Sequence, residues 1–114
     1  HYMDEAEQLC DRLVVMDRGR IVAEGTPRGL IVKHSTKEVL ELRLPSTISD
    51  AAERLADVGE RVEVLPDRVL VYANDGEEAL AESHRRGIEP LASLVRRSSL
   101  EDVFLRLTGR SLVE

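Results

Sequence analysis

The chain has 114 residues, and 42% of them are hydrophobic, which is enough for one ordinary domain or for a small domain with an appended segment. Its formal net charge of −6 argues against a nucleic-acid partner, because phosphate binding needs clustered Lys and Arg side chains. The single cysteine excludes an internal disulfide, and no apolar stretch approaches the roughly 20 residues of a membrane span. We therefore expect a soluble chain that would serve a membrane process only through another subunit.

The opening of the chain predicts an amphipathic helix over residues 4 to 13. Its apolar positions recur at i, i+3, i+4 and i+7: Ala6, Leu9, Cys10 and Leu13. Acidic residues stand at its start, where the helix dipole favours negative charge. Such a helix must bury its apolar face, so we expect it to pack against the rest of the chain or against a second copy.

A hairpin and a new helix start follow. Residues 13 to 16 and 20 to 24 predict two short strands, and Gly19 between them can supply the positive φ of a tight turn. Thr26 and Pro27 are residue types that begin a helix, as its N-cap and its first helical residue.

We place a linker at about residues 31 to 36. The stretch Lys33-His34-Ser35-Thr36 is polar and has no periodicity. Gly29 lowers the helix propensity just before it, so the helix that begins at Pro27 is expected to be short or frayed. The chain is thereby divided into an opening segment and a separate region from residue 37.

From residue 37 onward the hydrophobic pattern predicts an α+β domain. The expected elements are strand 37–44, helix 47–58, strands 61–65 and 68–73, helix 75–86, strand 88–95 and helix 99–109. Ser99 is expected to cap the last helix, whose apolar stripe is Leu100, Val103, Phe104 and Leu107. Two strand-helix-strand units in this order form a split βαβ, or ferredoxin-like, sheet with both helices on one face. A unit of about 60 residues has only marginal stability when it folds alone, so the closing helix or a partner surface is expected to add buried area.

The first thirty residues also carry a family resemblance. They run in the order histidine, acid-rich helix, buried strand, Arg-Gly turn, strand and Gly-Thr-Pro. This order resembles the end of the nucleotide-binding subunit of ABC transporters, from the switch histidine onward, and is most similar to ATPases of daunorubicin-resistance-type drug exporters. Residues 99–109 resemble the closing helix of their C-terminal extension. The resemblance implies a remnant of the nucleotide-binding domain at 1–30, a linker at 31–36 and a C-terminal accessory or regulatory domain at 37–114.

The resemblance identifies His1 as the switch histidine, which in these ATPases contacts the γ-phosphate of ATP and senses hydrolysis. The alternative, a terminal residue left from cloning, fits less well because residues 2 to 7 continue the motif in register. Phosphoryl transfer also needs a Gly-rich loop with its lysine, and no glycine of this chain is followed by lysine. We therefore expect His1 to be inactive in this chain and no cofactor to bind, whereas the full-length parent would use ATP and Mg²⁺.

Other groupings of reactive side chains have simpler interpretations. Asp4 and Glu5 beside His1 are residue types of a metal site, but no second histidine lies one helical turn away, so we interpret them as solvated acids and expect no metal. Cys10 with His34 or His84 would suggest a thiol nucleophile, but the place of Cys10 on an apolar stripe favours core packing.

Two functions from different classes fit these features. The favoured one is a non-catalytic accessory domain that dimerises or regulates the ATPase subunits of an ABC transporter for drug or lipid export, and so contributes to multidrug efflux and antibiotic resistance. Such a subunit would lie in the cytoplasm, at the inner face of the membrane, beside an integral-membrane permease. The alternative is a small-ligand sensor that regulates the transporter, which rests on fold-level analogy. We also expect a homodimer, in which the opening segment can exchange between copies.

Overall fold

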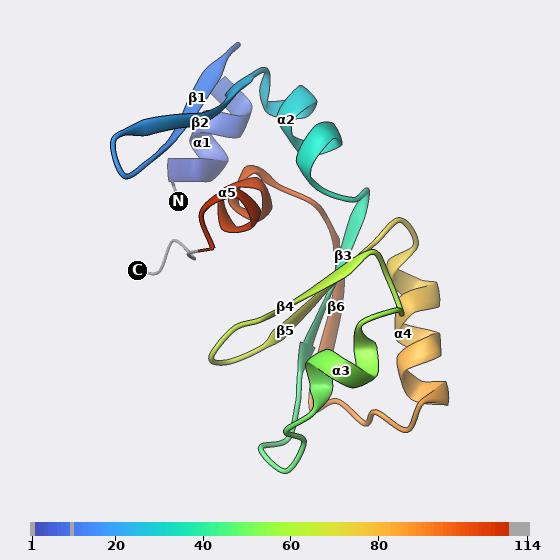
Figure 1. Cartoon of the computed structure of the whole chain (residues 1–114). Coiled ribbons are helices and arrows are strands. Elements are labelled where there is room, and N and C mark those ends of the chain that lie inside the picture. The colour runs from blue at the N-terminus through green and yellow to red at the C-terminus, as the bar shows by residue number, and fades with distance from the viewer. Residues whose placement is uncertain (1, 10, 110–114) are drawn as a thin grey trace. The chain divides into compact units, whose positions relative to one another are not determined.

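The computed structural model describes residues 2–9 and 11–109, and the chain divides into two compact units (Figure 1). One unit combines the two ends of the chain, His1–Ser35 with Ser98–Glu114, and the other is the segment Thr36–Arg97. The closing helix, predicted as part of the domain at 37–114, lies in the first unit because its apolar stripe packs into that unit's core.

In its described residues, the first unit consists of three helices and one hairpin. The elements are α1 Tyr2–Leu9, β1 Leu13–Asp17, β2 Arg20–Gly25, α2 Pro27–His34 and α5 Leu100–Thr108. Their buried side chains form one core of Val15, Leu30, Leu100 and Val103. Side chains from the hairpin and all three helices pack into or against this core, so the two ends of the chain stabilise each other.

The hairpin follows the sequence prediction. β1 pairs with β2 in antiparallel register. The turn residues Arg18 and Gly19 both have positive φ, of 54° and 77°. Two successive residues with positive φ are typical of the type I′ turn, whose twist matches that of the flanking strands. The tight turn expected at Gly19 is confirmed.

Helix α2 extends into the segment predicted as a linker. Thr26 is its N-cap, since Oγ1 accepts a hydrogen bond from the Gly29 backbone N–H at 2.9 Å, and Pro27 is its first residue, as expected. The helix continues to His34, within the expected linker at 31–36. A Cβ at Gly29 would lie 2.8 Å from Thr26 Oγ1, so this glycine leaves room for the cap.

Helix α1 ends earlier than the sequence predicts. It covers Tyr2–Leu9 rather than residues 4 to 13, and Leu13 opens β1. Ala6 packs against the first core, whereas Leu9 is 81% exposed, so only part of the expected apolar stripe is buried within this chain, and burial of the rest against a neighbour stays a prediction. Cys10 lies outside the described residues. The apolar periodicity gave the wrong end for the helix because the pattern continues from α1 into β1. Leu13 therefore packs against the core from a strand and not from the helix.

Helix α5 has the start, stripe and end that the sequence predicts. The Ser99 backbone N–H donates to Asp102 Oδ2 at 2.8 Å, as in a capping box. Gly109 ends the helix with a φ of 73°. The whole predicted stripe lies in or against the core of the first unit: Leu100, Val103, Phe104 and Leu107.

The second unit is a four-stranded antiparallel sheet with two helices. Its elements are β3 Glu38–Arg43, α3 Ala51–Leu55, β4 Arg61–Val64, β5 Val69–Ala73, α4 Gly76–Arg85 and β6 Ala92–Arg97. The strands lie in the order β4-β5-β3-β6. Each strand-helix-strand segment therefore skips one strand, since β5 lies between β3 and β4, and β3 lies between β5 and β6. The predicted α+β class is confirmed, and the ferredoxin-like assignment stays a prediction.

The core of the second unit lies between the sheet and its two helices (Figure 1). Alternate residues of each strand point to the same face, so Leu40 and Leu42 of β3 both face this core. The core also takes residues from both helices and from the segment after α4: Ala51, Leu55, Ala79 and Ile88.

Two elements of this unit differ from the prediction. α3 covers only Ala51–Leu55 rather than residues 47 to 58, and β6 begins at Ala92 rather than at Ile88. The Ile88 side chain is completely buried, and its backbone N–H donates to Ser83 O at 3.0 Å. Ile88 therefore closes α4 and fills the core, and the strand can begin only after the chain has returned to the sheet edge.

Candidate functional site

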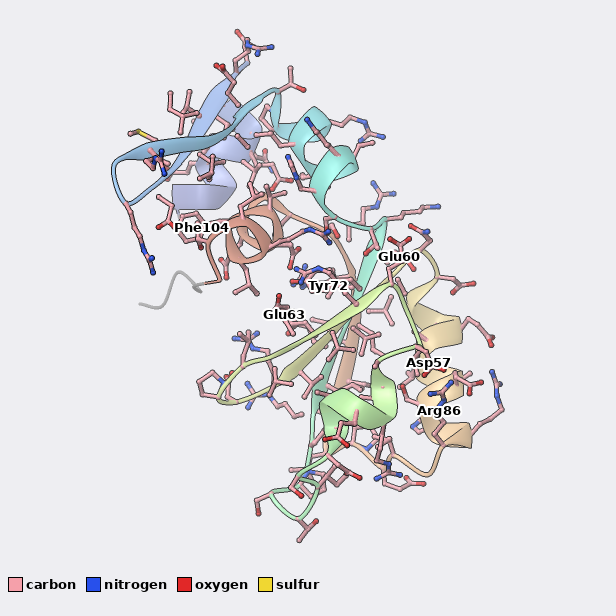
Figure 2. The ribbon with its side chains drawn as sticks, in the orientation of Figure 1. Asp57, Glu60, Glu63, Tyr72, Arg86 and Phe104 are labelled. Atoms are coloured by element: carbon pink, nitrogen blue, oxygen red, sulfur yellow. The ribbon has the colours of Figure 1, made fainter. Side chains whose placement is uncertain are left out.

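The face of the four-stranded sheet opposite α3 and α4 carries a set of charged and aromatic side chains. Successive residues of a strand point to opposite faces, and each of the four strands contributes at least one apolar side chain to the core on the side of α3 and α4. The alternate positions form the opposite face, which holds the apolar residues Val39, Leu70 and Leu94 as well as charged and aromatic ones. We call the charged and aromatic residues of this face the charged face: Glu41, Arg61, Glu63, Arg68, Tyr72 and Arg96. Glu63 and Tyr72 of this set are labelled in Figure 2.

Glu41 lies at the centre of the charged face. Its Oε1 accepts a hydrogen bond from Arg68 Nη1 at 3.0 Å, and its Oε2 accepts one from Arg96 Nε at 2.5 Å. Glu41 belongs to β3, and Arg96 belongs to β6, which lies beside β3. Arg68 directly precedes β5, the strand on the other side of β3. The strand order therefore places one carboxylate between two guanidinium groups.

Burial and the two arginines act on Glu41 in opposite directions. Burial alone would raise the pKa of this carboxyl, but the hydrogen bonds from Arg96 and Arg68 outweigh that effect, so the pKa of Glu41 is lowered. The hydrogen bond to Glu41 in turn raises the pKa of Arg68. All three groups are charged at neutral pH, which makes the cluster a fixed ion-pair network.

At the β4 edge of the charged face, Arg61 lies over the ring of Tyr72. The guanidinium carbon is 4.3 Å from the ring centroid, which is cation–π geometry. Arg61 Nη1 also donates to Glu63 Oε1. The other two guanidinium nitrogens of Arg61 are buried and find no hydrogen-bond acceptor among the described residues. Arg61 thus retains hydrogen-bonding capacity that the described part of the chain does not use.

A second ion-pair cluster joins α3 to α4, with Asp57 and Arg86 labelled in Figure 2. Arg86 Nη1 donates to Asp57 Oδ1 at 2.5 Å, and Nε donates to Glu82 Oε2 at 2.8 Å. Arg54 and Arg86 also donate to each other's backbone oxygens, at 2.8 Å and 3.0 Å. The hydrogen bond from Arg86 lowers the pKa of Asp57. These contacts fasten the last turns of the two helices together, which is a structural task.

The site residues expected from the sequence have different outcomes. His1 and Cys10 lie outside the described residues, so their expected roles stay predictions. Asp4 and Glu5 lie in α1, and His34 is the last residue of α2, where burial and neighbouring positive charges lower its pKa. Within residues 2–9 and 11–109, no three His, Cys, Asp or Glu side chains gather in a way that could hold a metal ion.

The charged face was missed by sequence reasoning, although a signal for it exists. Glu41 stands between Leu40 and Leu42, and Arg61 and Glu63 flank Val62 in the same way. Charge at every second position marks the face of a strand that points away from the main core, although this face also holds the buried residues Val39, Leu70 and Tyr72. Which charges meet depends on strand order and register, and neither can be read from a single strand.

Comparison with known proteins gives the relatives of the chain. Residues 48–109 match the family described as nodulation factor export protein NodI, C-terminal domain. The chain is 42% identical over 112 residues to the Nod factor export ATP-binding protein I of Burkholderia thailandensis, covering 98% of the chain and 36% of the relative. Proteins of the same name from Rhizobium sp. and Mesorhizobium japonicum are 41% identical, over 98% and 100% of the chain and 36% and 33% of their own lengths. The chain thus spans about a third of the length of these curated relatives.

The relatives' names confirm the broad resemblance and leave the narrow one without support. They are ATP-binding proteins of an export system, in agreement with an ABC transporter subunit. They are named for Nod factor export, so the narrower resemblance to daunorubicin-resistance exporters, with multidrug efflux and antibiotic resistance, is not confirmed. None of the helices that the structure describes has the length and apolar character of a membrane span. With 62 of its residues, 48–109, matched to that domain, the chain belongs to the NodI C-terminal-domain family of ABC transporter ATPase subunits.

Proposed function

We propose that this chain is the C-terminal part of an exporter ATPase subunit and acts as a non-catalytic accessory region that dimerises or regulates that subunit. The observation that carries the proposal is the pattern of similarity: 98% of the chain aligns with a Nod factor export ATP-binding protein, but the alignment covers only 36% of that relative. The remainder of such a protein has ample length for the phosphate-binding loop and magnesium ligands that phosphoryl transfer requires.

The surface of the first unit supports this proposal. Several of its large apolar side chains are exposed, notably Leu9 at 81%, Ile21 at 61% and Met16 at 54%. A group of exposed apolar residues on a small unit marks a surface that another body covers. We assign that body to the preceding part of the nucleotide-binding domain, to which α1 and the hairpin would belong, with His1 as its switch histidine.

The division of the chain into two compact units supports narrower boundaries for the proposed accessory region. Ser35 and Ser98 are the residues at which the first unit is interrupted, and their Oγ atoms are 2.8 Å apart in a hydrogen bond. The segment Thr36–Arg97 therefore leaves and rejoins the first unit at neighbouring points, as an inserted module does. We infer that this segment is the accessory module and that α5 completes the unit that precedes it.

The parent protein, under this proposal, binds ATP with Mg²⁺ and works with an integral-membrane permease at the cytoplasmic face of the membrane. Its cargo would resemble the nodulation factor for which the relatives are named. Export of a lipid or of a drug is the alternative. The chain's own contribution would be contacts between ATPase subunits, not chemistry.

An excision experiment tests the accessory role. In the full-length parent, residues 36–97 are replaced by a short Gly-Ser linker that joins Ser35 to Ser98, which the 2.8 Å contact between these two residues permits. We expect ATP hydrolysis to persist and its regulation or subunit association to change. The matched control removes residues 98–109 instead, which should unfold the first unit because Leu100 and Val103 belong to its core. A folded excision variant without any ATP hydrolysis would contradict the proposal.

A nucleotide titration tests the same proposal on this chain alone. Titration of the purified chain with ATP and Mg²⁺, followed by calorimetry, should show no saturable binding. Saturable binding at micromolar ATP would show that the chain itself holds a nucleotide site and would overturn the non-catalytic assignment.

One observation favours the small-ligand sensor as the second candidate. Arg61 has two buried guanidinium nitrogens without an acceptor among the described residues, and its guanidinium carbon lies 4.3 Å from the centroid of the Tyr72 ring. A small carboxylate could accept from these nitrogens. A panel of small carboxylates that fails to shift the amide NMR signals of Arg61 and Tyr72 would remove this candidate.

A further inference from the structure

The four-stranded sheet ends on one side in β6, and this edge is accessible. β6 is the outermost strand, paired only with β3, so one of its backbone edges is free among the strands of this sheet. Ala92, Ser93, Leu94 and Arg97 are exposed along it, and Leu94, near its middle, is 54% exposed. Leu91, just before the strand, is 74% exposed.

The usual protections of an edge strand are weak here. Soluble proteins guard edges with charged side chains, prolines or bulges. β6 contains no proline and no lysine, and its Arg96 is directed into the charged face, where it donates to Glu41. The one exposed charge of the strand is Arg97, at its last position. Alternate residues among the first five positions of β6 therefore present unguarded backbone donors and acceptors.

The charges at the two ends of this edge suit antiparallel pairing with an identical strand. Glu89 lies shortly before β6, Arg97 ends it, and both are exposed. Neither forms an ion pair in the described part of the chain. Antiparallel pairing of two copies about Leu94 places Arg97 of each opposite residue 91 of the other and two residues from its Glu89, a diagonal distance within reach of long side chains, which is favourable at both ends of the interface. A two-fold axis near the strand centre would bring the two exposed Leu94 side chains together.

The opposite edge of the sheet is a poorer candidate. β4 has only four residues, and its Arg61 and Glu63 side chains are already paired with each other. Pairing of β6 with the β4 edge of another copy would be heterologous and would continue as an open filament, whereas pairing of β6 with β6 closes as a dimer.

We propose that β6 is the contact strand of a homodimer, in which two copies of this chain join their sheets through antiparallel β6 strands. This inference deepens the dimerising role under Proposed function. The biological use of the dimer rests on that proposed function, whereas the contact itself is a property of this chain. The interface is small, so the dimer forms reversibly at micromolar concentration.

Sedimentation analysis of the purified chain over a range of concentrations tests the contact. The mass should rise with concentration from the 12.8 kDa of one chain towards twice that value. Leu94→Lys places two like charges near the axis and should keep the chain monomeric. The matched control is Val64→Lys on the other edge, since Val64 is 58% exposed, and it should dimerise as the unsubstituted chain does. Circular dichroism confirms that both variants are folded.

Disulfide trapping provides a readout that does not depend on affinity. In a Cys10→Ser background, Ser93→Cys or Leu94→Cys should give a covalent dimer under mild oxidation, because directly opposed residues of antiparallel strands have Cα atoms about 4.5 to 5.5 Å apart. Val64→Cys should stay monomeric. A chain that stays monomeric at all concentrations and gives no trapped dimer at residue 93 or 94, or one that is trapped equally at Val64, overturns the inference. The excision and nucleotide experiments on the ATPase have separate outcomes, so failure of one proposal is distinguishable from failure of the other.

Discussion

Replacing Glu41 by glutamine tests whether the charged face stabilises the sheet. The carboxylate is only 17% exposed and accepts from both Arg68 and Arg96. Hydrogen bonds to charged groups contribute roughly 1.5 to 3 kcal/mol each. Glutamine keeps the shape and one oxygen acceptor, so one charged bond is lost and the other weakens. The two arginines are 38% and 27% exposed and regain some hydration, so we expect a net loss of about 2 kcal/mol in the free energy of unfolding.

Urea denaturation at neutral pH measures this loss, with Glu78→Gln as the matched control. Glu78 also binds an arginine, Arg85, but both side chains are more than half exposed, at 63% and 57%. Ion pairs that are this exposed contribute little, so the control should change the midpoint far less. Equal losses in Glu41→Gln and Glu78→Gln would refute the claim that burial makes the Glu41 network important.

Measuring the stability of the unsubstituted chain and of Glu41→Gln at decreasing pH checks the electrostatic part of this prediction. The pKa of Glu41 is lower in the folded than in the unfolded chain, so its contribution is complete above the unfolded value of about 4.3. The contribution is lost as the pH falls through the folded pKa. The stability difference between the unsubstituted chain and Glu41→Gln should therefore shrink in acid. A difference that stays constant from neutral pH into acid would attribute the loss to packing.

Three further substitutions test the local structure by thermal or urea denaturation. Gly59→Ala should lower the free energy of unfolding by about 1 to 3 kcal/mol, because the added Cβ would clash with the backbone oxygen of Tyr72. An unchanged midpoint would mean that Gly59 does not lie so close to this oxygen. Thr26→Ala should cost about 1 kcal/mol by removing the cap on the Gly29 N–H, while Thr26→Ser should retain most of it. Leu100→Ala should cost about 2 to 5 kcal/mol, since Leu100 is buried in the first core, and a small loss there would argue that α5 does not complete that unit.

The elements that could be predicted from the sequence are those whose cause is local. The turn at Gly19 needs positive φ, the helix start at Thr26 needs a side-chain acceptor, and the end of α5 at Gly109 needs the left-handed conformation. Each requirement is met by the residue type itself and by its immediate neighbours. Such features can be predicted from the sequence without knowledge of the fold.

Where prediction was wrong, contacts distant in sequence decide the outcome. Ile88 has strand propensity but fills a core position after α4, which delays β6. Helix α1 ends at Leu9 rather than at residue 13, because the chain turns into β1, whose Leu13 packs against the first core. The Glu41 network needs residues separated by 27 and 55 positions, so only the strand order brings it together.

The grouping of α5 with the first unit changes how the whole chain is to be understood. From periodicity alone, the closing helix was an addition to the sheet domain that precedes it. Its stripe instead packs with Val15 and Leu30, and the Leu100 backbone N–H donates to Glu7 Oε1 of α1 at 3.0 Å. The sheet of 36–97 is therefore joined at both ends to elements of one core, at Ser35 through α2 and at Ser98 through α5.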